Sequence, residues 1–333
     1  MKKNIIGIGN AIVDVVCKVD DNFLKDLNLV KGSMSLISKG FVEKLSKLQY
    51  EKISSGGSVC NTIATLGELG CNAYFLGTIA NDEIGKKFSR DLELSNAKFI
   101  GKIEHDEDSA VSYILVTPDG QRTMCTFLGC ASIINEDDIF ASNFHSAEIL
   151  YIEGYLWDNP NTINSLKKAI KIAKKNNTKI IFSLSDIFCV QRHKKYFIDL
   201  IKNDLNIVFC NENEFLNLID KSKLDLNDLK QFHNSINKDL TIIITRSEKG
   251  CIVCNNGNII EIIAKKITSI MDTTGAGDIF ASGFIYGLIN HLDINKCCNY
   301  GNFLAGQIIQ KFGARFNKNE INKIKYENIV ESL

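Results

Sequence analysis

Apolar and polar positions alternate along this chain in two rhythms, which predict two kinds of element. Short apolar runs are typical of buried strands, whereas apolar residues three and four positions apart are typical of a helix face. The predicted strands cover residues 5–8, 73–76, 149–152, 179–182 and 207–209. The predicted helices cover residues 62–70, 83–94, 161–175, about 193–202, and a last one that includes 279–288.

This alternation predicts a parallel sheet with helices on both faces. Two stretches break the rhythm, because residues 11–19 with 33–37, and residues 98–127, hold strand patterns without intervening helices. The second stretch includes strands at 112–116 and 123–127, joined by a turn at Pro118-Asp119-Gly120. These stretches predict a separate small β-sheet.

Composition narrows the classes of partner. The 333 residues can bury a sizeable core as one large domain or two smaller ones. With 39 basic and 39 acidic residues, the chain lacks the positive footprint of a nucleic-acid binder or of a protein that anchors to anionic lipid. No stretch approaches the roughly 20 apolar residues of a membrane span. We therefore expect a small-molecule partner, with no nucleic acid and no membrane.

The cysteines and the first residues indicate the compartment. Eleven cysteines is an odd number, and the N-terminus runs directly into a strand pattern without a leader-like apolar region. We expect a cytoplasmic protein with reduced thiols. Cys251 and Cys254 have a metal-like spacing but lack the second Cys or His pair of a structural zinc site.

The most informative motif is Asp272-Thr273-Thr274-Gly275-Ala276-Gly277-Asp278, just before the apolar segment 279–288. If Gly275, Ala276 and Gly277 form the first turn of a helix, their N–H groups and the helix dipole bind a phosphate. Asp278 would then lie within reach of an acceptor hydroxyl and take its proton during phosphoryl transfer. The alternative is a tight turn followed by a solvated carboxylate.

Two glycine pairs near the N-terminus also suggest ligand contact. The sequence Gly7-Ile8-Gly9 after a strand suggests a dinucleotide-dependent oxidoreductase, but the third glycine of that fingerprint falls at Ile12. Gly56 and Gly57 precede an apolar helix, so they form either a loop capped by Ser58 or a close backbone approach to a ligand. In the second case Asn61, one turn into the helix, offers the ligand a donor and an acceptor.

Four motifs taken together resemble one family, the ribokinase-like (PfkB) carbohydrate and nucleoside kinases. They appear in the family's order and approximate spacing, at residues 7–14, 55–62, 211–214 and 272–278. The resemblance implies a three-layer α/β/α domain with a mostly parallel central sheet, and a small β-sheet lid inserted into it. The implied larger domain covers residues 1–10, 39–97 and 128–333, and the lid covers 11–38 and 98–127.

The resemblance also implies roles for individual residues around the acceptor. Asn10 and Asp14 would hydrogen-bond the vicinal hydroxyls of a sugar, with Gly56, Gly57 and Asn61 beside them. A purine would need a flat apolar wall, for which the candidates are Phe127, Leu128 and Trp157. By resemblance, closure of the lid on the acceptor would exclude water.

On the nucleotide side, the resemblance implies ATP and Mg²⁺. Asn211 and Glu214 would organise Mg²⁺ indirectly, through water, with a helix cap as the alternative interpretation. The expected ATP-binding residues are Asn211 again, with Thr245, Arg246, Gly250, Asn302, Ala305 and Gly306. The nucleotide loop departs from the family pattern, since Ser247 stands where a glycine is usual. Members of the family are often activated by a monovalent cation, and K⁺ near Asp272 and Thr274 is left open.

The acceptor is the least determined part of the prediction. Residues 9–14, 21–24 and 154–158 look most like the adenosine-kinase-like branch, which implies phosphorylation of adenosine to AMP. Arg122 is the only arginine on the 117–127 hairpin, which argues against a phosphorylated sugar as acceptor. The alternatives are a PfkB sugar kinase for ribose, fructose or 2-keto-3-deoxygluconate, and a catalytically silent nucleoside- or sugar-binding regulator. The lid edges predict a monomer or a homodimer formed through the lid.

Overall fold

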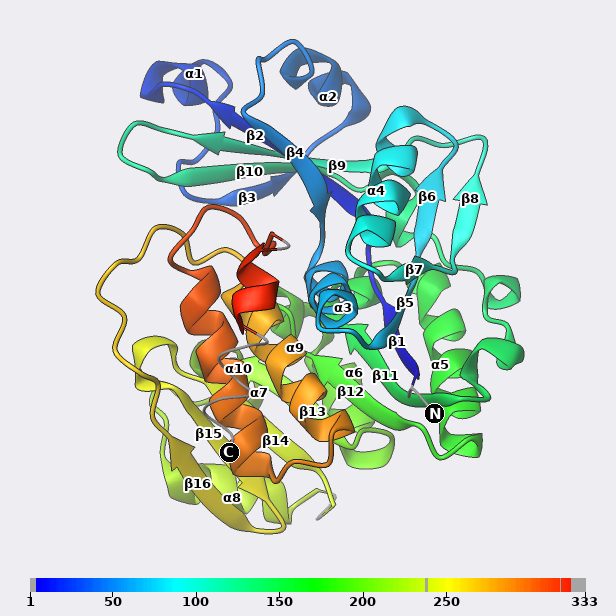
Figure 1. The fold of residues 1–333 in the computed structure, drawn as a ribbon, viewed down its shortest axis with the longest axis vertical. Coiled ribbons are helices and arrows are strands. Elements are labelled where there is room, and N and C mark those ends of the chain that lie inside the picture. Colours follow the sequence, from blue (N-terminus) through cyan, green and yellow to red (C-terminus); the bar gives the residue numbers. More distant parts are fainter. Residues whose placement is uncertain (1–3, 237–238, 318, 325–333) are drawn as a thin grey trace.

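The computed structural model describes residues 4–236, 239–317 and 319–324. Its larger part is built on a nine-stranded sheet (Figure 1). In spatial order the strands are β16 (Asn258–Ile262), β15 (Cys251–Asn255), β14 (Thr241–Thr245), β13 (Ile207–Asn211), β12 (Lys179–Ser183), β11 (Ala147–Glu153), β1 (Asn4–Ile8), β5 (Asn72–Leu76) and β7 (Lys98–Phe99). Neighbours from β14 to β7 are parallel, and β15 and β16 extend one edge antiparallel.

Helices cover both faces of this sheet, and for this reason β1 is apolar on both sides, with Ile5, Ile6 and Ile8 at most 1% exposed. One face carries α3 (Ser58–Glu68), α4 (Glu83–Leu94), α9 (Ala276–Ile289) and α10 (Ile294–Ile308). The other carries α5 (Pro160–Lys175), α6 (Ile187–Asn203), α7 (Glu212–Ile219) and α8 (Leu226–Asn234). The three-layer prediction is confirmed, and α6 begins before the predicted residue 193 because Asp186 caps it.

A five-stranded sheet lies above the larger part in Figure 1 and confirms the predicted small β-sheet; it is called the lid below, although its role as a lid stays a prediction. Its strands, in spatial order, are β3 (Met34–Leu36), β10 (Arg122–Phe127), β9 (Ala110–Val116), β2 (Ile12–Lys18) and β4 (Lys52–Gly56). Two short helices, α1 (Asp21–Asp26) and α2 (Lys39–Leu45), cover its outer side, where Leu24 and Leu45 are buried. Because strand β2 starts at Ile12, no helix follows Gly9, and the interpretation of Gly7-Ile8-Gly9 as a dinucleotide-binding motif is wrong.

The structure corrects the elements expected at the lid boundaries. Strand β4 belongs to the lid sheet because it pairs with β2, whereas residues 39–97 had been assigned to the larger domain. Within 98–127, β7 joins the large sheet, and β8 (Lys102–Glu104) pairs with β6 (Thr78–Ala80). A helix, α1, also separates β2 from β3, because Asp20 accepts a hydrogen bond from the Phe23 N–H at its start.

The two-domain division itself stays a prediction, and its outermost residues, 1–3 and 325–333, lie outside the described residues. Among the helices that the structure describes, none combines the length and apolar character needed to cross a bilayer.

Candidate active site

The predicted phosphate loop lies at the N-terminus of α9, which begins at Ala276. Gly275 caps this helix with a φ of 75°, and a Cβ there would overlap the Ala314 side chain, so conformation and packing both require glycine. First-turn N–H groups have no intrahelical partner and carry the positive end of the dipole. The Ala276 N–H, however, donates to the Thr273 carbonyl at 3.2 Å, which leaves Gly275 and Gly277 as the better donors to an anion.

Asp278 lies in the first turn of α9 and is held by α3. The Ser58 hydroxyl donates to Oδ1 at 2.6 Å, and Asn61 Nδ2 donates to Oδ2 at 2.8 Å. The alternative in which Ser58 caps α3 is therefore wrong, because Gly57 occupies the cap position. Burial raises the pKa of Asp278 to about 6, against the lowering effects of Asn61, Ser58 and the Arg315 charge. A base with a pKa near neutrality is suited to accept a proton from an alcohol.

Two buried oxygen atoms near the start of α3 have no hydrogen-bond partner within the described part of the chain. They are Oδ1 of Asn10 and Oδ1 of Asn61, both on side chains predicted to contact the acceptor. Buried polar atoms in native proteins nearly always have partners. Two such acceptors in one site indicate a ligand that donates hydroxyl or amino hydrogens.

Asp14 and the glycine pair lie together, as predicted. Asp14 is half-buried on β2, and its carboxylate lies where a Cβ on Gly56 would be. Gly57 has a φ of 90°, and a Cβ there would be 2.6 Å from the Asn10 carbonyl oxygen. Burial raises the pKa of Asp14 to about 7, opposed mainly by the positive charge of Arg315. The two glycines therefore allow the lid strand and α3 to approach Asn10 and Asp14 closely.

Glu153 is a site residue that the sequence analysis missed. It ends β11, is 1% exposed, and accepts hydrogen bonds from Asn10 N at 2.8 Å, Asn10 Nδ2 at 3.0 Å and Val59 N at 3.0 Å. Burial raises its pKa to about 7. By occupying the Asn10 amide donor, Glu153 fixes which way the unpartnered Oδ1 points. A carboxylate directly after the apolar run 149–152 is the signal that could have revealed it.

Arg122 connects the lid to the phosphate loop. Its guanidinium forms an ion pair with Asp272 at 2.6 Å and donates to the Thr274 hydroxyl at 3.1 Å. The Asp272 carboxylate also accepts the N–H groups of Thr274 at 3.0 Å and Gly313 at 2.7 Å. Both side chains named for K⁺ are thus engaged by a guanidinium, and K⁺ could use them only by displacing it. They do not fit K⁺ in this conformation.

Asn211 and Glu214 lie at the carboxyl end of β13 and form a capping box at the start of α7. Asn211 N and Nδ2 donate to the Glu214 carboxylate, and the Glu214 N–H donates back to Asn211 Oδ1 at 2.9 Å. Burial raises the pKa of Glu214 to about 7, and the nearby charge of Asp186 adds to this. The capping-box alternative is therefore what the structure shows, and the role of Asn211 and Glu214 with a hydrated Mg²⁺ stays a prediction.

The nucleotide loop follows β14, which ends at Thr245. Ser247 has a φ of 51°, so it adopts the left-handed conformation for which a glycine is usual, and Gly250 has a φ of 85°. The departure from the family pattern therefore leaves a glycine-like backbone path. Arg246 is paired with Glu212 at 3.0 Å and Glu261 at 2.9 Å, so a phosphate would have to compete with two carboxylates for it.

The residues expected around adenine share the inner side of α10. Asn302 Nδ2 donates to the Ile262 carbonyl at 3.5 Å, and Ile267 packs against Gly306, with Ala305 beside it. Plain packing accounts for these contacts, and their role with adenine stays a prediction.

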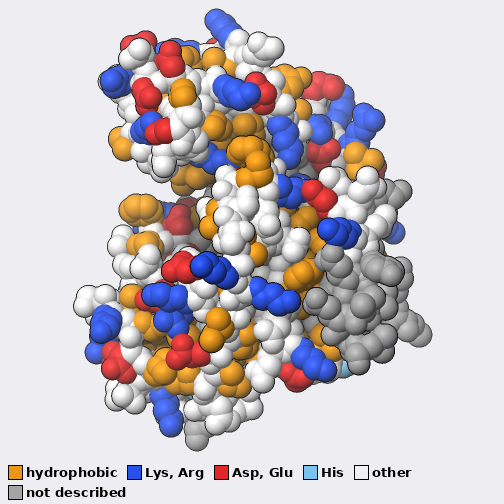
Figure 2. Space-filling view, turned by 60° about the vertical axis from the view of Figure 1, so that its left-hand side comes forward, with side chains coloured by type: hydrophobic (Ala, Val, Ile, Leu, Met, Phe, Trp, Pro, Cys, Tyr) orange, Lys and Arg blue, Asp and Glu red, His pale blue; other side chains and the backbone are white. Residues whose placement is uncertain are grey.

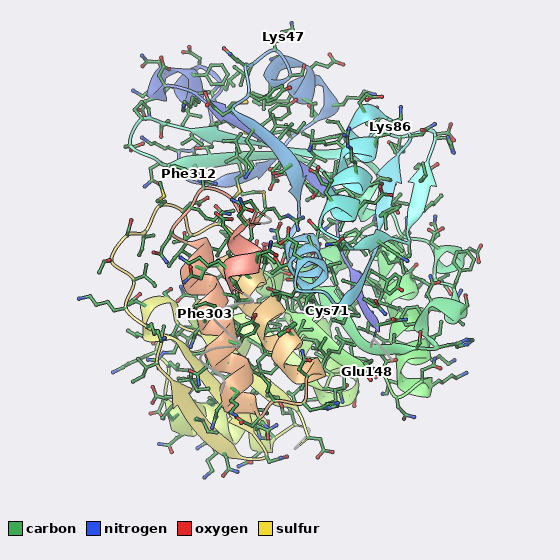
Figure 3. The ribbon with its side chains drawn as sticks, in the orientation of Figure 1. Lys47, Cys71, Lys86, Glu148, Phe303 and Phe312 are labelled. Atoms are coloured by element: carbon green, nitrogen blue, oxygen red, sulfur yellow. The ribbon has the colours of Figure 1, made fainter. Side chains whose placement is uncertain are left out.

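A cavity of about 270 Å³ lies between the lid and the segment after α10. Asp14 and Asn61 line it together with Ile114 and Phe312; Figure 2 shows the molecule hollowed here, and Figure 3 labels Phe312 below the lid. Phe127 is not among the lining residues; it packs against the main core. Trp157 as a purine wall is wrong: it is 2% exposed and packs edge-on against two core phenylalanines.

The metal-like spacing of Cys251 and Cys254 does not create a site. Three residues apart on β15, their side chains point to opposite faces of the sheet and join different cores. Among the described residues, the one group with metal-like geometry is Asp158, Cys189 and His193, where Arg192 and His193 already hydrogen-bond the Asp158 carboxylate.

Comparison with known proteins gives a family match over most of the chain. Residues 16–321 match the family described as pfkB family carbohydrate kinase. The adenosine kinase of Saccharomyces cerevisiae is 25% identical over 98% of this chain and all of that protein.

Solved structures agree with this fold over nearly the whole chain. An adenosine kinase from Sinorhizobium meliloti has a TM-score of 0.88 and 32% identity, covering 98% of this chain and 100% of that one. A probable sugar kinase from Rhizobium etli CFN 42 has the same TM-score and identity, covering 100% of this chain and 99% of that one.

Proposed function

This chain belongs to the pfkB family of carbohydrate kinases and is a phosphotransferase, and we propose that it transfers a phosphoryl group from ATP to a hydroxymethyl group of adenosine. The observation that carries the proposal is the pair of buried, unpartnered oxygens near the start of α3: Asn61 Oδ1, whose amide nitrogen donates to Asp278, and Asn10 Oδ1, whose amide nitrogen donates to Glu153. A molecule with several hydroxyl groups would satisfy them, with Asp14 accepting a further hydroxyl hydrogen.

The positions of the side chains support the catalytic roles that we propose. Asp278 takes the proton of the attacking hydroxyl, and the buried site keeps that carboxylate basic enough to do so. The N-terminus of α9, with Gly275 and Gly277, holds the transferring group, and Arg122 brings a positive charge from the lid to the same loop. Mg²⁺, held near Glu214 and Asn211 through water, would neutralise phosphate charge.

Adenosine is preferred over a sugar because adenosine kinases recur among the relatives and structural neighbours and because part of the cavity wall is apolar. The probable sugar kinase from Rhizobium etli keeps a sugar acceptor as the second candidate. An adenosine kinase of this kind would act in purine salvage, and we place it in the cytoplasm, as a monomer or a lid-mediated homodimer. The intact phosphate loop argues against a silent regulator.

The test is ADP production by the purified protein with ATP and Mg²⁺, offered adenosine, other nucleosides, ribose, fructose and 2-keto-3-deoxygluconate in parallel. Adenosine should give the highest kcat/KM. Preference for a sugar would overturn the choice of acceptor and retain the reaction, whereas acceptor binding without turnover would favour the regulator.

A further inference from the structure

The segment after α10, residues 309–317, returns to the active site and is called the C-terminal strap here. The Ile309 carbonyl accepts the N–H groups of Met271 at 2.8 Å and Asp272 at 3.2 Å. Further along, the Gly313 N–H donates to Asp272 Oδ2, and Ala314 packs against Gly275. The strap therefore fixes the loop that carries the phosphate-binding helix terminus.

The next residue of the strap, Arg315, reaches the other half of the site. Its Nη1 donates to the Cys60 carbonyl at 3.0 Å, and Nη2 donates to Ser55 Oγ at 3.0 Å and contacts Cys60 Sγ at 3.1 Å. Nε and Nη2 also donate to the Ser55 carbonyl at 3.3 Å. Ser55 directly precedes the glycine pair, and Cys60 directly precedes Asn61. The Arg315 side chain thus holds both ends of residues 55–60, which carry the glycine pair and are called the acceptor loop here.

All of these acceptors are neutral, and among the described residues no ion pair to a carboxylate is formed by Arg315. Its positive charge instead lowers the pKa values of Asp14, Asp278 and Glu68. The other charged groups that act on Asp14 are Arg122, Lys52 and Asp278 itself. Around Asp278, the titratable neighbours are Asp14, Glu153, Tyr151 and Tyr155. Arg315 is therefore the cation shared by the predicted base and the predicted acceptor-binding carboxylate.

We propose that Arg315 is a positioning residue for the transfer reaction: it locks the acceptor loop to the phosphate loop through the strap, and its charge keeps Asp278 available as a base. This inference rests on the proposed function. It does not follow from the motifs of the sequence, because Arg315 lies outside all of them and is recruited only by the return of the strap.

The test compares Arg315→Met, which removes charge and hydrogen bonds, with Arg315→Lys, which keeps the charge but not the forked geometry. Arg90→Met, at an exposed arginine on α4, is the control. We expect Arg315→Met to lower kcat/KM for the acceptor roughly 10- to 100-fold, the loss of hydrogen bonds to a charged group. Its acid limb in the pH–rate profile should move to higher pH, because Asp278 loses a neighbouring cation. Arg315→Lys should raise the acceptor KM but leave the acid limb in place.

An acid limb that coincides in wild type, Arg315→Met and Arg315→Lys would overturn the inference, whatever the change in rate, because a purely structural role lowers activity without moving the limb. A second readout does not depend on turnover: the difference in melting temperature between wild type and Asp278→Asn grows with pH and levels off at the folded-state pKa of Asp278, so the pH of levelling reports that pKa. Repeated in the Arg315→Met background, that pH should rise, and an unchanged value contradicts the proposal. If the wild type phosphorylates none of the acceptors, only the proposed function is contradicted. The melting experiment still tests the role of Arg315.

Discussion

At the residue scale, the site is defined by buried carboxylates whose environments keep them partly protonated near neutral pH. Burial raises the pKa of Asp14, Glu153 and Glu214 to about 7 and that of Asp278 to about 6. Groups whose pKa is shifted by burial are enriched at functional sites, although burial also raises the pKa of Glu68, outside the site, to about 7. Three of these four carboxylates were predicted from sequence motifs, whereas Glu153 was recognised only in the folded structure.

The pKa of Asp278 makes a prediction about stability. A folded-state pKa of about 6, above the roughly 3.9 of an unfolded aspartate, means that ionised Asp278 destabilises the fold at neutral pH. This penalty disappears as the pH falls through about 6 towards 4. Asp278→Asn should therefore melt at a higher temperature than wild type at pH 8, and the difference should shrink on acidification. A difference in melting temperature that does not change with pH would contradict the raised pKa.

Single residues also show what the sequence could not reveal. Asn10, Asp14, Asn61 and Asp278 were placed in one site by motif, and the structure brings them together. Glu153 and Arg315 belong to no motif, and their contacts depend on how a strand end and the C-terminal strap return to the site. Trp157 was misplaced because an aromatic residue beside a motif cannot be told from a core residue without knowing which side of the sheet it faces.

At the element scale, the strands and helices predicted from periodicity are present; the wrong assignments fell at the lid, and β14, β15, β16, α8 and α10 had not been predicted. Strand β4 was missed because its sequence, Lys52-Ile-Ser-Ser-Gly56, is too polar and short to read as a strand, and only pairing with β2 defines it. Helix α1 was missed because six residues carry too little periodicity to distinguish a helix from a loop.

The nucleotide loop offers an element-scale test. Ser247 is held at a φ of 51°, which costs a residue with a Cβ roughly 1–2 kcal/mol, while glycine adds back about 0.5–1 kcal/mol of unfolded-chain entropy. Ser247→Gly should therefore stabilise the protein by up to about 1 kcal/mol in urea unfolding, with ATP affinity kept. Clear destabilisation would show that the serine side chain makes the loop more stable than its backbone strain suggests.

At the scale of the whole molecule, the lid and the larger part meet over the cavity, and the ion pair of Arg122 with Asp272 links them. Its ion pair with Asp272 is largely shielded, with the two side chains 17% and 3% exposed. We therefore expect closure of the lid to depend on the contact of Arg122 with Asp272.

Arg122→Met should lower kcat/KM by at least about 10-fold, since hydrogen bonds to charged groups contribute about 1.5–3 kcal/mol each. ATP hydrolysis without acceptor, measured as ADP release, should rise relative to transfer because water enters the less firmly closed site. Arg122→Lys, which keeps the charge, is the matched control, and its kcat/KM should lie between those of wild type and Arg122→Met. Unchanged kinetics in Arg122→Met would remove the lid link from the account.

The central claim is that Asp278 removes a proton from an acceptor hydroxyl during transfer from ATP. The most direct measurement is kcat for wild type and Asp278→Asn on the preferred acceptor, with acceptor affinity measured separately by calorimetry. The account predicts a fall in kcat of at least about 10²-fold, the low end for loss of a general base, with acceptor affinity nearly unchanged. Near-normal turnover in Asp278→Asn would contradict it.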